Sequence, residues 1–304
     1  MSHYRILTFD GGGIRGVYSA RLLERLEQSN PGFLKRVNLL SGTSTGGIIA
    51  LGLACGLTAS DLVALYLTRG QEIFDDSWLD NVLDLGTIIG SQYDNRKLKK
   101  VLTETFGAKT KLGDLTKRVL IPTFDLANEK EPKPTRKWKP KFFHNYVGED
   151  SDGHELVVEV AMYTSAAPTF FPAHKGYIDG GVAANNPSMS ALAQAIDTRF
   201  GDASVGSVRL LSLGTGTNPA RIEGNDLDWG LAQWAKPLVS LMIDGMMGVA
   251  DYQCARLLGD RYLRISPMLP QIIDLDDWRK AGELVDLADA ADLTDADAWV
   301  KRWM

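Results

Sequence analysis

Apolar positions along the chain follow two periods, and the change from one to the other predicts its elements. Short apolar runs bounded by turn residues predict buried strands, and longer stretches with leucines three or four apart predict helices. The chain opens as a strand from Tyr4 to Phe9, a helix from Val17 to Gln28, a strand from Val37 to Leu40 and a helix from Ile48 to Cys55. This alternation is typical of an α/β fold with a mostly parallel sheet between helices.

The remaining pattern extends the same alternation to the end of the chain. Helices are predicted from Ala59 to Phe74, from a cap at Asp94 to Phe106, from Leu156 to Ser165, from Ser188 to Phe200 and around Leu231 to Leu258, with strands from Arg118 to Phe124, Val208 to Leu213 and Tyr262 to Ile265. The acidic tail from Trp278 has leucines at helical spacing. We expect one domain over residues 1–304, with the core motifs in 4–217 and the helices and strand of 228–304 packed on it.

Composition narrows the class of protein. The formal net charge of -5 argues against a nucleic-acid polymer held by a broad basic surface. Cys55 and Cys254 lie far apart in apolar helical stretches and form neither a metal-ligand spacing nor a disulfide framework. The start MSHYRILTFD lacks the regions of a signal peptide, and no later run is long enough to span a membrane. These features predict a cytoplasmic protein without a metal or another cofactor.

Two stretches between the predicted elements admit two interpretations each. The stretch from Glu129 to Lys141 holds six basic residues among prolines and Trp138. It suits peripheral contact with anionic lipid head groups, and a solvated hairpin accounts for it as well. The stretch from Trp78 to Ile89 is apolar but irregular, so it is either ordinary packing or a flap over an apolar site.

The strand that starts at Val37 leads into GTSTG at residues 42–46, which matches G-x-S-x-G. An apolar helix follows directly and ends at Gly56. Strand, sharp turn and helix form the context of a nucleophile elbow, in which a strained turn points a serine hydroxyl out above the sheet. Ser44 is therefore the candidate nucleophile, although a glycine-rich turn without chemistry shares the same pattern.

Two further glycine loops follow predicted strands and should lie at the same edge of the sheet. The sequence DGGGIRG occupies residues 10–16, and GTGT occupies residues 214–217. Three consecutive glycines can turn their N–H groups into one concavity that holds an anion, and Arg15 adds a positive charge there or forms a surface ion pair.

The first loop also fits the G-x-G-x-x-G pattern of dinucleotide-binding proteins. That function needs an acidic residue at the end of the second strand, where this chain has Leu39-Leu40-Ser41-Gly42. No glycine loop ends in the Gly-Lys-Ser/Thr of a Walker A motif. Nucleotide binding is the weaker hypothesis for this loop. The stretch Asn185-Asn186-Pro187 is interpreted as an Asn cap followed by Pro at the first helical position.

Three motifs in register carry a resemblance to a known family. DGGGIRG at 10–16, GTSTG at 42–46 and DGG at 179–181 resemble the signature of the patatin-like phospholipases, as do SAAPTFFP, ANNP and LSLGTGT between and after them. The likeness covers residues 4–217, with looser likeness up to the strand YLRI. It implies a three-layer α/β/α fold and a Ser-Asp dyad that hydrolyses acyl esters of membrane phospholipids.

Residue by residue, the resemblance makes Ser44 the nucleophile and Asp179 its base. It assigns the oxyanion site to Gly11, Gly12, Gly13 and Arg15. It leaves two other functions open, which are a binding module that kept the scaffold and a phospholipase effector of antiphage defence switched on by a cyclic nucleotide. A homo-oligomer also stays open.

No histidine is expected to take part in the chemistry. In an α/β-hydrolase triad the order is serine, acid and histidine, and no histidine follows Asp179. His174 lies five residues before Asp179, in a stretch expected to be a surface turn, and His144 closes the basic segment. A carboxylate acting directly on serine needs shelter from water, because an exposed Asp with a pKa of about 3.9 is a poor base.

Overall fold

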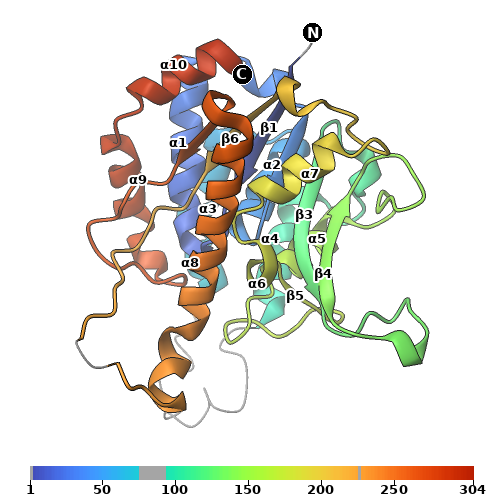
Figure 1. Cartoon of the computed structure of the whole chain (residues 1–304), viewed down its shortest axis with the longest axis vertical. Coiled ribbons are helices and arrows are strands. Elements are labelled where there is room, and N and C mark those ends of the chain that lie inside the picture. The colour runs from blue at the N-terminus through green and yellow to red at the C-terminus, as the bar shows by residue number, and fades with distance from the viewer. Residues whose placement is uncertain (1–2, 75–93, 225–226) are drawn as a thin grey trace.

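The computed structural model describes residues 3–74, 94–224 and 227–304, and the predicted stretch from Trp78 to Ile89 lies outside them. A seven-stranded sheet runs through the centre of the molecule in the order β4-β3-β2-β1-β6-β7, with β5 paired to β3 (Figure 1). The strands are β1 (Tyr4–Phe9), β2 (Leu39–Gly42), β3 (Arg118–Asp125), β4 (Lys139–His144), β5 (Tyr177–Asp179), β6 (Val208–Leu213) and β7 (Tyr262–Ile265).

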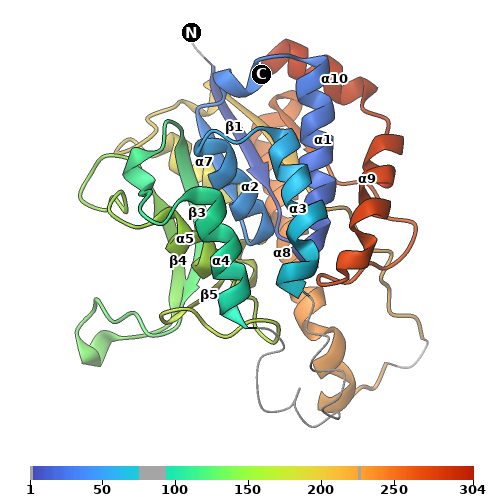
Figure 2. The same cartoon turned by 180° about the vertical axis from the view of Figure 1, so that it is seen from behind.

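Neighbouring strands from β3 to β7 along this order are parallel, and only β4 and β5 run antiparallel to β3. The predicted mostly parallel sheet is confirmed. The carboxyl ends of the parallel strands point to the lower end of the molecule in both views (Figures 1 and 2). Loops after parallel strands therefore gather at this edge, where open α/β sheets build their sites.

Helices cover both faces of the sheet. They are α1 (Gly16–Ser29), α2 (Thr45–Ala54), α3 (Ala59–Phe74), α4 (Asn95–Phe106), α5 (Val157–Ser165), α6 (Gly181–Ala184), α7 (Ser188–Ile196), α8 (Leu231–Leu258), α9 (Ala281–Ala290) and α10 (Thr294–Trp303). Helices α7 and α8 cover the face of the sheet that is in front in Figure 1. Helices α1 to α4 cover the opposite face, which is in front in Figure 2. The arrangement is the expected three-layer α/β/α fold.

Alternation along the strands divides the core in two. In β1, Leu7 and Phe9 point to the larger cluster, which α1 to α5, α9 and α10 complete. Ile6 of the same strand points to the smaller cluster, with Cys254 and Leu258 of α8 and side chains of α7. Side chains that alternate between two packed faces leave no solvent-facing side, which accounts for the continuous apolar runs of these strands.

The strand β4 was not expected from the sequence. The basic segment forms the connection between β3 and β4, so the hairpin interpretation is right about its form, and its last residues, from Lys139, belong to the strand. Residues 129–138 are exposed, whereas Phe143 and His144 further along β4 are buried. Prolines and lysines mask the strand pattern, because an edge strand buries only part of its length.

Candidate active site

Ser44 lies in the predicted sharp turn between β2 and α2. Its backbone has φ 56° and ψ -125°, a region that residues with side chains rarely adopt. The turn closes because Gly42 and Gly46 carry no Cβ. A Cβ on Gly42 would strike the carbonyl of Gly46, and one on Gly46 would strike the carbonyl of Phe9. The sequence therefore folds this way locally because glycines flank the serine on both sides.

Hydrogen bonds from three other segments hold the turn. The Ser44 N–H donates to Thr164 Oγ1 at 2.9 Å, and that hydroxyl donates to the Pro122 carbonyl at 2.6 Å. The Thr43 hydroxyl donates to the Ala184 carbonyl at 2.6 Å. The strained turn is thus fixed from β3, α5 and α6 together, which keeps the serine in one position.

Asp179, at the end of β5, lies beside the Ser44 side chain, whose hydroxyl favours the charged form of the carboxyl group. Its carboxylate also accepts the N–H of Gly181 at 2.7 Å, and its own N–H donates to the Ala166 carbonyl at 3.0 Å. Asp179 is only 5% exposed, and this burial raises its pKa to about 6, against the opposing influence of the Ser44 hydroxyl and the Gly181 N–H. The carboxyl group is therefore sheltered, as direct proton transfer from a serine requires.

The glycine loop after β1 lies beside this pair, but its N–H groups are not equivalent. The Gly11 N–H donates to the Asn185 carbonyl at 3.1 Å, so this N–H is already used in the structure, and a role for Gly11 at an oxyanion stays a prediction. The Gly12 and Gly13 N–H groups have no partner among the residues that the structure describes. Thr45 begins α2, where the first N–H groups have no partner within the helix. Unused N–H groups close to a nucleophile in the chain are candidates for the donors that hold an oxyanion.

Arg15 is partly buried just after the glycine loop. Burial lowers the pKa of its guanidinium, and the carboxylates of Asp244, Asp10 and Asp274 oppose that shift. Its Nε is buried without a hydrogen-bond partner in the described parts of the chain. A cation with an unused donor next to free N–H groups is suited to an anion.

In the described part of the chain, the side chains of His144 and His174 contact residues other than Ser44 and Asp179. His174 lies in an exposed turn, as expected for this stretch, but its side chain is only 13% exposed and bonds Glu159 through Nε2 at 2.7 Å. His144 is buried and packs edge-on against Tyr146 and Phe200. Packing and ion pairing therefore account for both histidines.

Asn185 is a site residue that sequence reasoning missed. The helix α7 has Pro187 at its N-cap, not at its first helical position, and the Asn186 side chain accepts the N–H of Ser188 at 3.0 Å. Asn185 makes no cap. Its carbonyl accepts the Gly11 N–H, and its Nδ2 donates to Met247 Sδ of α8 at 3.0 Å. Only the fold brings these segments together, so no local pattern signals this role.

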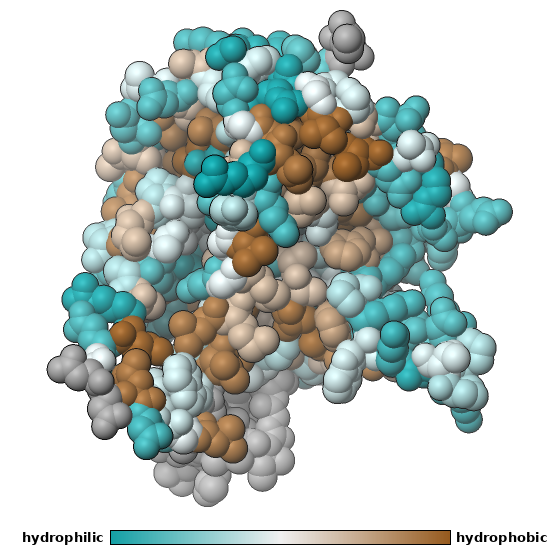
Figure 3. Space-filling model, in the orientation of Figure 1, coloured by the Kyte–Doolittle hydropathy of each residue, from teal (hydrophilic) through white to brown (hydrophobic). Residues whose placement is uncertain are grey.

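Helix α8 presents apolar side chains to solvent as it crosses this face. Val239, Met242, Val249 and Tyr252 are each more than half exposed. Between α8 and the segment of α6 and α7 lies a groove of about 560 Å³, lined by Met189, Met242 and Met246 among other mostly uncharged residues. In Figure 3 hydrophobic side chains gather on the front face that α8 crosses. Such a surface is unusual for a protein that contacts only water.

Comparison with known proteins identifies the family. The family model described as "Patatin-like phospholipase" matches residues 7–192, which is more than half of the chain. The chain is 30% identical to the CotR protein of Bacillus subtilis (strain 168), covering all of this chain and 99% of that protein. It is 34% identical to a protein of Pseudomonas aeruginosa named cGAMP-activated phospholipase, over 86% of this chain and 78% of that one. Among solved structures, VipD from Legionella pneumophila aligns over 95% of this chain and 67% of its own, with 13% identity and a TM-score of 0.43.

The chain therefore belongs to the patatin-like phospholipase family, whose members are serine-nucleophile acyl hydrolases. The resemblance read from the three motifs is confirmed. Within the described ranges, no helix combines the length and the apolar character needed to cross a bilayer.

Proposed function

We propose that this chain is a lipid acyl hydrolase of the phospholipase A type, with Ser44 as nucleophile and Asp179 as its base. The observation that carries the proposal is the placement of a serine, held in a strained turn, beside a buried carboxyl group whose pKa it influences. A base is most effective when its pKa lies near the working pH, and the value of about 6 for Asp179 meets that condition.

The reaction follows from these positions. Asp179 takes the hydroxyl proton as Ser44 Oγ attacks the ester carbonyl, and the C=O oxygen becomes an oxyanion. The N–H groups of Gly12, Gly13 and Thr45 stabilise this negative charge. Arg15 follows the glycines closely in the chain, and its positive charge stabilises the oxyanion further. Asp179 then returns the proton to the leaving alcohol. A water molecule, activated by the same carboxylate, hydrolyses the acyl-serine and restores the enzyme.

Contact with a membrane surface is part of the proposal, because the ester to be cleaved lies in a bilayer. The connection between β3 and β4 and the amino-terminal half of α8 both lie at the lower end of the molecule in both views, the same end as the site (Figures 1 and 2). Trp138 in that connection is 71% exposed, and the amino-terminal half of α8 supplies Val239 and Met242, each more than half exposed. Basic and apolar groups around one edge are typical of an interfacial surface.

The contacts within the connection between β3 and β4 separate its braced basic residues from its exposed ones. Arg136 donates to the carbonyls of Glu129 and Glu131 and braces the connection, and Lys141 pairs with Asp152 at 2.7 Å. The other exposed cations of this connection are Lys130, Lys133 and Lys137. We assign the head-group contact to these three lysines.

The test is hydrolysis of phospholipid vesicles by the purified protein, with release of fatty acid and lysophospholipid measured by mass spectrometry. We expect both products from wild type and neither from Ser44→Ala. A folded wild type that cleaves soluble esters but no phospholipid would restrict the function to a soluble ester hydrolase.

Activation by a cyclic nucleotide is the second candidate, and it deepens the same function. Similarity across 86% of the chain to a protein named for such activation favours it. Vesicle assays with and without a panel of cyclic di- and trinucleotides decide between the two. Hydrolysis that starts only with one nucleotide supports a latent effector, and equal rates in all samples support a constitutive hydrolase.

A further inference from the structure

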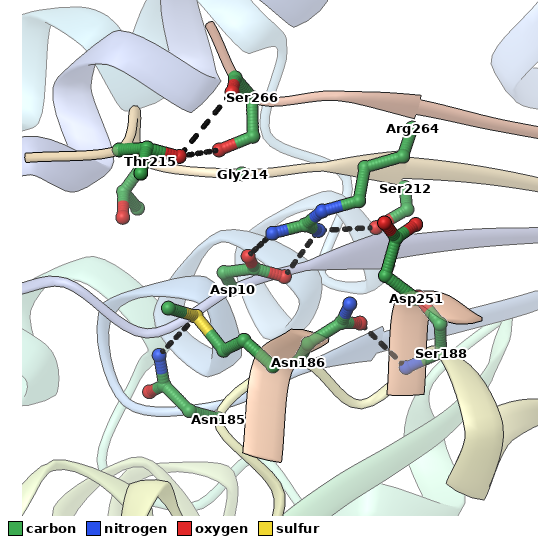
Figure 4. Close-up of polar contacts among 12 residues, drawn as sticks. Asp10, Asn185, Asn186, Ser188, Ser212, Gly214, Thr215, Asp251, Arg264 and Ser266 are labelled. Carbon is green, nitrogen blue, oxygen red and sulfur yellow. Dashed lines mark hydrogen bonds and ion pairs between the residues drawn. The ribbon is translucent and has the colours of Figure 1, made fainter. Parts of the chain in front are cut away.

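A buried ion pair joins the last strand to the start of the glycine loop. Asp10, the residue after β1, is 1% exposed, and the Arg264 side chain from β7 is 15% exposed. Arg264 Nη2 donates to Asp10 Oδ2 at 2.5 Å and Nη1 donates to Oδ1 at 3.2 Å, so the contact has two prongs (Figure 4). Nη1 also donates to the Ser212 hydroxyl of β6 at 2.9 Å. One guanidinium therefore connects the ends of three neighbouring strands.

The residue held in this way is the point where the two halves of the site meet. Asp10 is followed directly by the glycine loop. Its carbonyl and that of Phe9 contact Gly46 of the serine turn so closely that a Cβ there would strike both. A shift at Asp10 therefore moves the oxyanion donors and the nucleophile relative to each other.

No other described side chain forms an ion pair with Asp10. Burial raises the pKa of Asp10, and Arg264 opposes that rise and is the largest favourable influence on the charged form. Asp251 of α8 is the negative neighbour, and Arg15 contributes only a weaker attraction. Without Arg264, a carboxylate would lie buried beside the loop on which an oxyanion forms.

We propose that Arg264 is a positioning residue of the active site: its two-pronged contact with Asp10 fixes the carboxyl end of β1, and with it the distance between the glycine loop and Ser44. Arg264 lies outside the 7–192 match to the family, so the match does not assign it this role. The inference rests on the proposed function, because it is measured through ester turnover.

The experiment compares wild type with Arg264→Met, Arg264→Lys and the double variant Asp10→Asn/Arg264→Met. Turnover of a soluble short-chain ester gives kcat and KM, and thermal unfolding gives Tm. Arg264→Met leaves a buried charge unpaired and should lower Tm, whereas the double variant carries no buried charge and should unfold near the wild-type Tm. If the contact positions the loop, the double variant still loses about 10²-fold in kcat, with KM little changed.

Arg264→Lys keeps the positive charge but cannot make the bidentate contact with Asp10, so we expect about a 10-fold loss of kcat. The matched control is Arg21→Met/Asp289→Asn, which removes a pair at 2.7 Å between α1 and α9, away from the site. Its kcat should stay within about 2-fold of wild type. Wild-type kcat in a folded double variant overturns the inference alone, and a wild-type protein without ester turnover contradicts the proposed function as well.

Discussion

The pH dependence of turnover gives a quantitative test of the role of Asp179. Only the ionised carboxylate can take the serine proton, so kcat/KM on a soluble ester should rise with pH and level off above the pKa of about 6. At pH 5 about one tenth of the carboxyl groups are ionised, and at pH 7 about nine tenths are. An exposed Asp, with its pKa near 3.9, would already be almost fully ionised at pH 5.

The same burial predicts a stability effect of defined sign. Between the ordinary pKa of 3.8 and about 6, the folded protein binds a proton at Asp179 that the unfolded chain has lost. Stability therefore falls as pH rises through this window, by about 3 kcal/mol if this group acts alone. Asp179→Asn cannot ionise, so its Tm should gain on the wild-type Tm as pH rises from about 4 to 7. The variant should also lack activity at every pH.

Thermal unfolding and ester turnover, measured on both proteins at matched pH, test the two effects together. A histidine base would give a limb near pH 6.5, so the profile is repeated with His144→Ala and His174→Ala. A limb near pH 4, or a limb that disappears in either histidine variant, would refute the assignment. So would a Tm difference between wild type and Asp179→Asn that does not change with pH.

Three further predictions concern groups around the dyad. Gly12→Ala should lose roughly 10²–10³-fold in kcat, because its Cβ would strike the Thr215 side chain and displace a donor. The control Gly282→Ala has open space around it and should keep the wild-type kcat. Equal kcat in both folded variants would mean that the Gly12 N–H does not stabilise the oxyanion. His144→Ala and His174→Ala should keep most ester turnover, and complete loss in either would contradict a dyad. Replacing the exposed lysines of the connection between β3 and β4 by Gln should weaken co-sedimentation with anionic vesicles and leave turnover of a soluble ester unchanged (Lys130, Lys133 and Lys137). The control replaces three exposed lysines elsewhere by Gln (Lys35, Lys109 and Lys301). Equal sedimentation of the two variants would make that connection a solvated hairpin.

Local patterns were sufficient for the elements that carry the chemistry. The strands at Tyr4–Phe9, Val208–Leu213 and Tyr262–Ile265 were predicted with the observed bounds, because a short, mostly apolar run bounded by polar or turn residues is typical of a strand in a buried sheet. The turn at Ser44 was predicted from the glycines on either side of it. In these stretches the residues that determine the structure are neighbours in the sequence.

The supports of the site were not predictable in the same way. Asp10 and Arg264 are 254 positions apart, and Asn185 and Gly11 are 174 apart, so no spacing rule relates them. The Gly11 N–H is already used by one backbone hydrogen bond to Asn185, which the packing of α6 and α7 brings into place. A pattern shows which residues can donate, and only the assembled fold shows which donors are already used.

Covalent labelling of the purified protein by a fluorophosphonate tests the central claim most directly. The reagent forms a stable phosphonyl ester with an activated serine, and mass spectrometry of peptides identifies the residue that carries it. The account predicts one equivalent of label on Ser44, and slower labelling below pH 6 as Asp179 becomes protonated. It also predicts no label on a folded Ser44→Ala variant. Label on another serine, or full ester turnover in Ser44→Ala, would contradict it.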